Sequence, residues 1–108
     1  MSIIDPITFQ VISTGLTGIV REMQLLLFRT GYSTAIRESQ DASCAILDRQ
    51  GNLVAQFRSL YMHMGIFRVM MDALFENYPP SEMEEGDVFI LNHPYQGGST
   101  HVSDMGEV

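Results

Sequence analysis

The sequence predicts an α+β fold on three observations. A long opening segment has apolar residues at helical spacing, and two short apolar runs are joined by a turn signal. A second helical segment then leads to a further apolar run. The predicted order is therefore helix, hairpin, helix, strand and loop, which is an α+β arrangement. At 108 residues the chain has room for one domain at most, with a modest core.

The first helix is expected to begin at Asp5 and Pro6, because an acidic N-cap followed by proline is a strong start signal. The apolar residues that then recur at helical spacing, for about six turns, are Ile7, Val11, Ile12, Leu16, Ile19, Val20, Met23, Leu26 and Leu27. Gly31 is the expected stop. We expect a helix this long and this apolar to be buried on more than one side and to pack into a large body.

The two short apolar runs, 43–48 and 53–56, are predicted to form a β-hairpin. Asp48 and the pair Gly51-Asn52 give a good hairpin signal between them. This hairpin is the second element of the predicted fold.

Residues 65–78 are predicted to form the second helix, which the pair 79–80, two prolines, brings to an end. Its apolar positions repeat the helical period through Ile66, Val69, Met70, Ala73 and Leu74. Residues 87–91 are predicted to form a strand, and everything after them is predicted to be loop.

Charge and cysteine content exclude several classes of partner. The formal net charge of −7, from 6 basic and 13 acidic residues, argues against nucleic acid or an anionic membrane as a partner.

The N-terminus lacks a signal-peptide pattern, and no apolar run approaches the roughly 20 residues of a membrane span. Cys44, the single cysteine, permits no internal disulfide and lies in an apolar run, so we expect a buried structural thiol. The sequence thus predicts a cytoplasmic protein.

The stretch 92–104, directly behind the predicted strand, holds the clearest candidate for chemistry. His101 and Asp104 lie three residues apart, and an imidazole nitrogen with a carboxylate oxygen suits zinc, manganese or iron(II). The same spacing occurs by chance, and its other interpretation is a solvated loop histidine with an acid nearby. The glycine pair 97–98 and the position at a strand end favour a ligand-binding loop.

Asp41 is a further candidate for the same site, and the chain has two other histidines. Asp41 lies where the chain enters the hairpin, and could be a third oxygen ligand or a turn-capping acid. His63, flanked by methionines, is expected to be a core histidine, whereas His93 could line the pocket or only the surface. No phosphate-binding glycine pattern is present, so any ATP must be bound by another chain.

Several stretches, in order along the chain, are similar to those of a known family. They are 5–12 (DPITFQVI), 29–33 (RTGYS), 37–48 (RESQDASCAILD), 51–56 (GNLVAQ), 63–65 (HMG), and 86–92 (GDVFILN) with the loop pairs 94–95 (PY) and 97–98 (GG). On these stretches the chain resembles the amino-terminal part of the hydantoinase B/5-oxoprolinase family, to which the large subunits of acetone carboxylases are related.

The resemblance implies that residues 1–108 are the N-terminal segment of a larger subunit, working beside an actin-like partner of the hydantoinase A type. In that scheme the partner binds ATP and Mg and phosphorylates a substrate carbonyl, and the B-type subunit completes hydrolysis at a divalent metal. The family's metal site corresponds to Asp41, His101 and Asp104, with a further histidine expected beyond Val108. The metal would be zinc, manganese or iron, and no general base is assigned.

The implied activity is ATP-dependent hydrolysis of a small cyclic amide such as a hydantoin, oxoproline or lactam, in a hetero-oligomer, with residues 1–108 inactive alone. Three alternatives stay open: a ketone carboxylase of the acetone carboxylase type, a non-catalytic truncated fragment, and a free-standing acidic binding module. Two departures from the family pattern bear on substrate preference. His93 stands where an acid is common, and the loop reads Gly-Gly-Ser-Thr-His instead of a shorter Gly-Gly-Thr-His.

Overall fold

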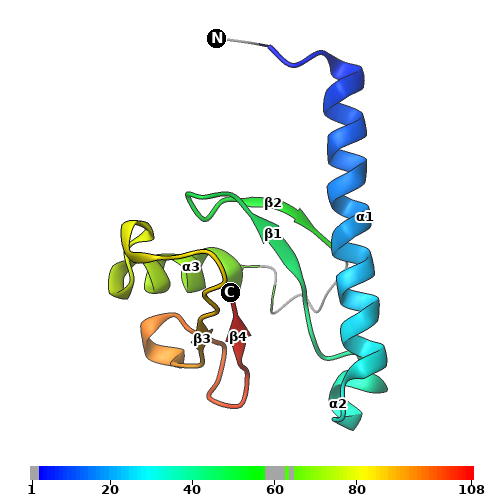
Figure 1. The fold of residues 1–108 in the computed structure, drawn as a ribbon. Coiled ribbons are helices and arrows are strands. Elements are labelled where there is room, and N and C mark those ends of the chain that lie inside the picture. The colour runs from blue at the N-terminus through cyan, green and yellow to red at the C-terminus, as the bar shows by residue number, and fades with distance from the viewer. Residues whose placement is uncertain (1–2, 58–62, 64) are drawn as a thin grey trace. The chain divides into compact units, whose positions relative to one another are not determined.

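The computed structural model describes residues 3–57, 63 and 65–108, and it confirms an α+β fold (Figure 1). The chain divides into two compact units, one made of Met1–Leu47 with Leu53–Leu60 and the other of Asp48–Asn52 with Tyr61–Val108. The first unit holds the long helix and the hairpin strands. The second holds the shorter helix and the loop with the candidate site.

Helix α1 spans Pro6–Thr30 and begins and ends as the sequence predicts. The Asp5 carboxylate accepts hydrogen bonds from the backbone N–H groups of Ile7 and Thr8, at 3.1 and 3.0 Å, which satisfies donors that a helix start leaves open. At the other end the N–H of Gly31 donates to the carbonyl of Leu27 at 2.9 Å. Gly31 is extended rather than left-handed, so it ends the helix by turning the backbone out of it.

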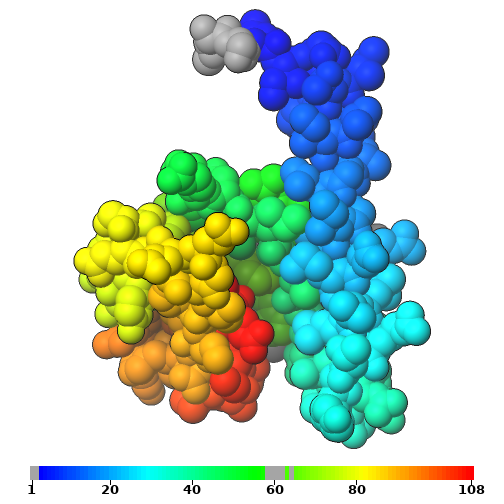
Figure 2. All heavy atoms as spheres, in the orientation of Figure 1, coloured from blue at the N-terminus to red at the C-terminus, as the bar shows by residue number. Residues whose placement is uncertain are grey.

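The first unit buries only one side of α1. Val20, Gln24 and Phe28 of α1 are buried together with Ala55 of strand β2. Large apolar side chains elsewhere on the helix stay exposed, among them Ile7, Phe9, Val11, Ile12, Ile19, Met23, Leu25 and Leu26. Within the described residues α1 is buried on one side only, and its burial in a larger body stays a prediction. Figure 2 shows the N-terminal turns of the helix extending past the hairpin of the same unit.

Helix α1 is also long and apolar enough to cross a membrane, since an 18-residue window in it has a mean hydropathy of 1.3. The core helix of a soluble protein and a signal sequence pass the same test. By length and composition alone the finding is weak support for a membrane span.

A short helix that the sequence did not predict, α2 at Thr34–Arg37, precedes the hairpin. Strands β1 (Ala45–Leu47) and β2 (Leu53–Gln56) then pair antiparallel, with Ile46 opposite Ala55. The hairpin prediction is confirmed, although the first strand is three residues shorter than 43–48. At the start of the predicted strand, the side chain of Gln24 bonds the carbonyl of Ala42 and the N–H of Cys44.

The turn 48–52 and helix α3 belong to the second unit. Asp48 accepts hydrogen bonds from the backbone N–H groups of Gln50 and Asn52, both at 2.9 Å, which closes the turn. Helix α3 spans Ile66–Asn77, one residue shorter at each end than the predicted 65–78. It buries Met70, Met71 and Leu74 on one face, with Leu74 only 1% exposed.

The second unit contains one more strand than the sequence predicts. Strand β3 (Ile90–Leu91) pairs antiparallel with β4 (Gly106–Glu107), after the short 3-10 helices η2 (Pro80–Glu82) and η3 (Pro94–Gln96). Backbone bonds of 2.8 and 2.9 Å between Phe89 and Val108 extend this pairing. The prediction that only loop follows residue 91 is wrong, because a two-residue strand carries no period of its own and forms through its distant partner.

Candidate functional site

The loop 92–105 joins two paired strands, so its two ends lie side by side. Leu91 and Gly106 are directly opposite in the β3–β4 ladder. At the start of the loop the backbone N–H of Gln96 donates to Nδ1 of His93 at 3.2 Å, and the N–H of Gly98 donates to the carbonyl of His93 at 2.8 Å. The first half of the loop is therefore a tight, hydrogen-bonded turn.

The glycine pair is required because side chains do not fit there. A Cβ atom on Gly98 would lie 2.7 Å from the backbone nitrogen of His93. Gly97 has a φ of +83°, and a Cβ atom there would lie 2.8 Å from Cγ1 of Val69 on helix α3. The loop thus packs directly against α3, which gives the following residues a firm support.

His101 and Asp104 come together in the second half of this loop. The backbone N–H of Asp104 donates to the carbonyl of His101 at 3.0 Å, and Nε2 of His101 lies 3.5 Å from Oδ2 of Asp104. Both side chains remain accessible, 58% exposed for His101 and 31% for Asp104. The structure thus brings these two candidate ligands to one place on the surface of the second unit.

The spacing of this pair is longer than a hydrogen bond, lies in the range of a histidine–carboxylate ion pair, and also matches two ligands of one metal ion. An N–H···O hydrogen bond usually spans about 2.7–3.2 Å, shorter than the 3.5 Å found here. Two ligand atoms bound at about 2.1 Å to one tetrahedral zinc ion lie about 3.4 Å apart. The imidazole and the carboxylate are therefore already at a separation that a divalent ion can bridge.

Three hydroxyl groups hold the pair, and the sequence reasoning missed all of them. Ser99, which is buried, donates to the carbonyl of His101 at 2.8 Å. The hydroxyl of Thr100 donates to Oδ2 of Asp104. The hydroxyl of Ser103 lies 2.8 Å from Nδ1 of His101. The available signal was the run Ser-Thr-His-Val-Ser-Asp, in which hydroxyl residues flank both candidate ligands.

Asp41 belongs to the first unit, whereas His101 and Asp104 belong to the second. It lies where the sequence places it, four residues before strand β1, after a left-handed turn at Gln40. Its backbone N–H donates to the carbonyl of Ala35 at 3.0 Å. Among the described residues, no three His, Cys, Asp or Glu side chains form a group that could hold a metal. The three-ligand set therefore stays a prediction.

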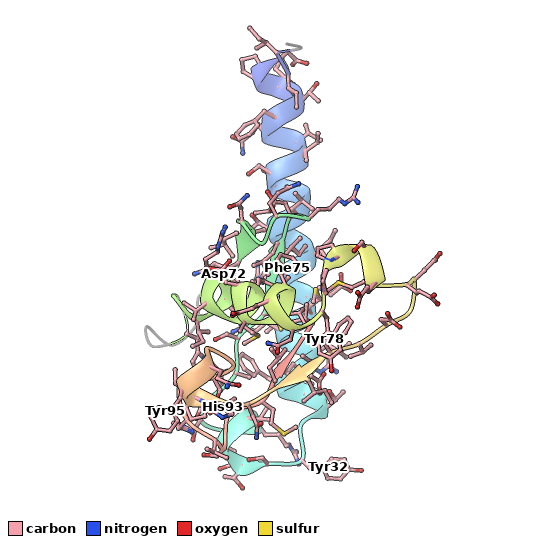
Figure 3. All side chains as sticks on the ribbon, turned by 90° about the vertical axis from the view of Figure 1, so that its left-hand side faces the viewer. Tyr32, Asp72, Phe75, Tyr78, His93 and Tyr95 are labelled. Carbon is pink, nitrogen blue, oxygen red and sulfur yellow. The ribbon has the colours of Figure 1, made fainter. Side chains whose placement is uncertain are left out.

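His93 and Cys44 have other surroundings. Nδ1 of His93 already accepts the N–H of Gln96, so its neutral ring carries the proton on Nε2 and offers no free lone pair. Its ring stands edge-on to that of the exposed Tyr95, with centroids 6.2 Å apart (Figure 3). Cys44 is half-buried, and this burial raises the pKa of its thiol, which disfavours the reactive thiolate.

Comparison with known proteins finds relatives that are similar in sequence along nearly the whole chain. The chain is 36% identical over 103 residues to an uncharacterized protein of Methanocaldococcus jannaschii, an alignment covering 94% of the chain and 18% of that relative. It is 36% identical over 102 residues to a 5-oxoprolinase of Saccharomyces cerevisiae, covering 94% of the chain and 8% of the relative. A putative B-type subunit of a D-/L-hydantoinase of Pseudomonas sp. is 36% identical over 106 residues, covering 95% of the chain and 18% of the relative.

The chain thus spans less than a fifth of the length of these relatives. No solved structure matches the chain. The sequence model of one family, hydantoinase B/oxoprolinase, matches residues 5–107, which is nearly the whole chain. The chain therefore belongs to the hydantoinase B/oxoprolinase family.

Proposed function

We propose that the chain contributes metal ligands to an ATP-dependent hydrolase of small cyclic amides, which acts together with an actin-like partner subunit that binds ATP and Mg. The observation that carries this proposal is the 3.5 Å spacing of His101 Nε2 and Asp104 Oδ2, on a loop inside the family match. Asp41 is proposed as the third ligand.

The names of the relatives support the substrate class. A 5-oxoprolinase and a hydantoinase subunit are both named for five-membered rings that contain an amide bond. The same chemistry in this chain would require a carbonyl carbon to be made more electrophilic and a water molecule to be positioned beside it. The residues found in the loop suit this chemistry, because they supply one nitrogen and one carboxylate ligand and leave an accessible side.

A divalent ion bound there would polarise the substrate carbonyl or lower the pKa of a bound water to about 7. The loop would supply two of the side chains that bind the ion. The imidazole of His101 supplies a neutral donor, and the carboxylate of Asp104 supplies a negative one, both on a loop braced against α3. Their exposure leaves room for substrate on the outer side of the loop.

Helix α1 supports the part of the proposal that places the chain in a larger assembly. Its exposed residues Phe9, Ile12, Ile19, Met23 and Leu26, with the half-buried Leu16 among them, recur every three or four positions. This is the spacing by which one helix packs lengthwise on another. A hydrophobic surface of this kind is costly in water, so we propose that other polypeptide covers it in the active assembly.

The test is an activity assay on the larger B-type subunit that we propose contains residues 1–108, produced together with a hydantoinase A-type partner. Hydrolysis of 5-oxoproline and of hydantoin is followed with and without ATP, for the natural protein, His101→Ala and Asp104→Asn. Glu85→Gln, which changes an exposed carboxylate of the same unit, is the matched control. We expect ATP-dependent hydrolysis that both loop variants lose by about a hundredfold or more and that the control keeps. Full hydrolysis in either loop variant contradicts the proposal. So does the absence of ATP-dependent hydrolysis in the natural protein.

A further inference from the structure

The hydroxyl of Ser103 stands at one nitrogen of the His101 ring, and the carboxylate of Asp104 stands at the other. Nδ1 lies 2.8 Å from Ser103 Oγ, and Nε2 lies 3.5 Å from Asp104 Oδ2. The ring is therefore held between a group that can accept a hydrogen bond and a group that can share a metal. The two ring nitrogens therefore have different neighbours: a hydroxyl group at Nδ1 and a carboxylate at Nε2.

We propose that Ser103 is a positioning residue for the metal site: its hydroxyl accepts the Nδ1–H of His101 and so presents the Nε2 lone pair beside Asp104. This inference rests on the proposed function, because it concerns the same pair of ligands. A neutral imidazole carries one N–H, and the nitrogen that binds a metal cannot be the one that carries it. Since Nε2 is the nitrogen beside the carboxylate, the proton belongs on Nδ1, where Ser103 is the acceptor.

Thr100 restrains the second ligand, as a donor rather than an acceptor. Its hydroxyl donates to Oδ2 of Asp104, which limits rotation of the carboxylate. The buried Ser99 fixes the backbone between them through the carbonyl of His101. Each ligand therefore has its own hydroxyl partner. Partners of this kind orient metal ligands, and losing one typically costs about 10- to 100-fold in metal affinity.

His93 provides an internal contrast on the same loop. Its Nδ1 accepts a hydrogen bond from the backbone N–H of Gln96, so the proton of its neutral ring is on Nε2. The two loop histidines are thus expected to have opposite tautomers when His101 is metal-bound. A single nitrogen NMR spectrum can show both.

The experiment is a titration of the larger B-type subunit that we propose contains residues 1–108, with Zn²⁺ alone, followed by calorimetry and by ¹⁵N NMR of the histidine rings. Four variants are compared with the natural protein: Ser103→Ala, Ser103→Thr, His101→Ala and Ser81→Ala. Ser81 is an exposed serine of the same unit and serves as the control. Folding is checked for each variant from its backbone NMR spectrum.

We expect Zn²⁺ affinity to fall about tenfold or more in Ser103→Ala, to stay within about threefold in Ser103→Thr, and to be lost in His101→Ala. In the Zn²⁺-loaded natural protein the ring proton of His101 is expected on Nδ1 and visible by NMR. In Ser103→Ala it should disappear through exchange with water.

Two results overturn the inference, and they are distinguishable. Zn²⁺ binding that His101→Ala abolishes but Ser103→Ala leaves unchanged overturns the role of Ser103 and leaves the metal site standing. Zn²⁺ binding that is absent, or that does not depend on His101, overturns the metal site and the role of Ser103 together.

Discussion

The side chain of Gln24 holds the backbone of Cys44, because its Oε1 atom accepts the Cys44 N–H at 3.0 Å. Its Nε2 atom donates to the carbonyl of Ala42 at 3.3 Å, and the residue is only 1% exposed. One buried amide on helix α1 thus fixes the segment that runs from Asp41 into strand β1. The first unit depends on this contact both for its packing and for the placement of a proposed ligand.

Replacing Gln24 with leucine is therefore expected to destabilise the protein by about 2 kcal/mol, because two partly buried backbone groups lose a hydrogen-bond partner. Urea unfolding followed by circular dichroism measures the change. Gln10→Leu is the control, since Gln10 is exposed on the same helix and its side chain donates to the hydroxyl of Thr14 one turn away. Equal stabilities for the two variants would show that the contact contributes nothing.

Gly98→Ala is expected to destabilise the protein by about 1–3 kcal/mol, since the new methyl group would meet the backbone of residue 93, which cannot rotate away. Gly15→Ala offers a control of opposite sign. A Cβ atom there meets nothing within 4 Å, so the variant is expected to gain up to about 1 kcal/mol from better helix propensity. Thermal unfolding of both variants checks the pair, and a stable Gly98→Ala protein would rule out the described loop packing.

Asp48 is expected to make stability depend on acidity. The side-chain amide of Asn52, followed by the Asn52 backbone N–H, lowers the pKa of the Asp48 carboxyl below its ordinary value of 3.8. A carboxyl whose pKa is lowered on folding adds stability that is present above the unfolded pKa and is lost as pH falls through the folded pKa. This contribution should thus be complete above about pH 5 and vanish below the lowered pKa.

An NMR titration of the Asp48 carboxyl carbon measures that pKa directly. In Asn52→Ala the pKa is expected to rise towards 3.8, because the largest cause of the shift is removed. An unchanged pKa in this variant would mean that the turn is held in some other way.

Cys44 is expected to react slowly with iodoacetamide near pH 8. Burial raises the pKa of its thiol, so little thiolate is present at that pH. Mass spectrometry of the alkylated protein should show a rate at least about tenfold higher in denaturing urea than in buffer. Equal rates in the two conditions would show an exposed thiol and count against the packing of β1 on α1.

Local signals in the sequence are enough to predict the elements whose ends are marked by a capping residue, a turn residue or a proline. Asp5 and Pro6 start α1, and Asp48 closes the turn between the hairpin strands. Helix α3 followed from its apolar period and the prolines behind it. These features are short-range, so they can be predicted without knowledge of the rest of the fold.

Long-range features could not be predicted in this way. Strand β4 exists because Gly106 and Glu107 find partners fifteen or more positions earlier in the chain. The buried role of Gln24 depends on backbone groups 18 and 20 residues away. The sequence predicts only part of the candidate site. Residue type and spacing identify the pair His101 and Asp104, but they do not identify the hydroxyl groups that contact the pair.

Asp41, His101 and Asp104 are proposed to hold one metal ion, and metal content tests this most directly. The protein is purified together with its partner subunit, and its zinc, manganese and iron are measured by mass spectrometry, alongside Asp41→Ala and His101→Ala. The proposal predicts about one metal ion per chain in the natural protein and a loss of that ion in both variants. Metal that persists in His101→Ala, or a natural protein that holds none, would contradict it.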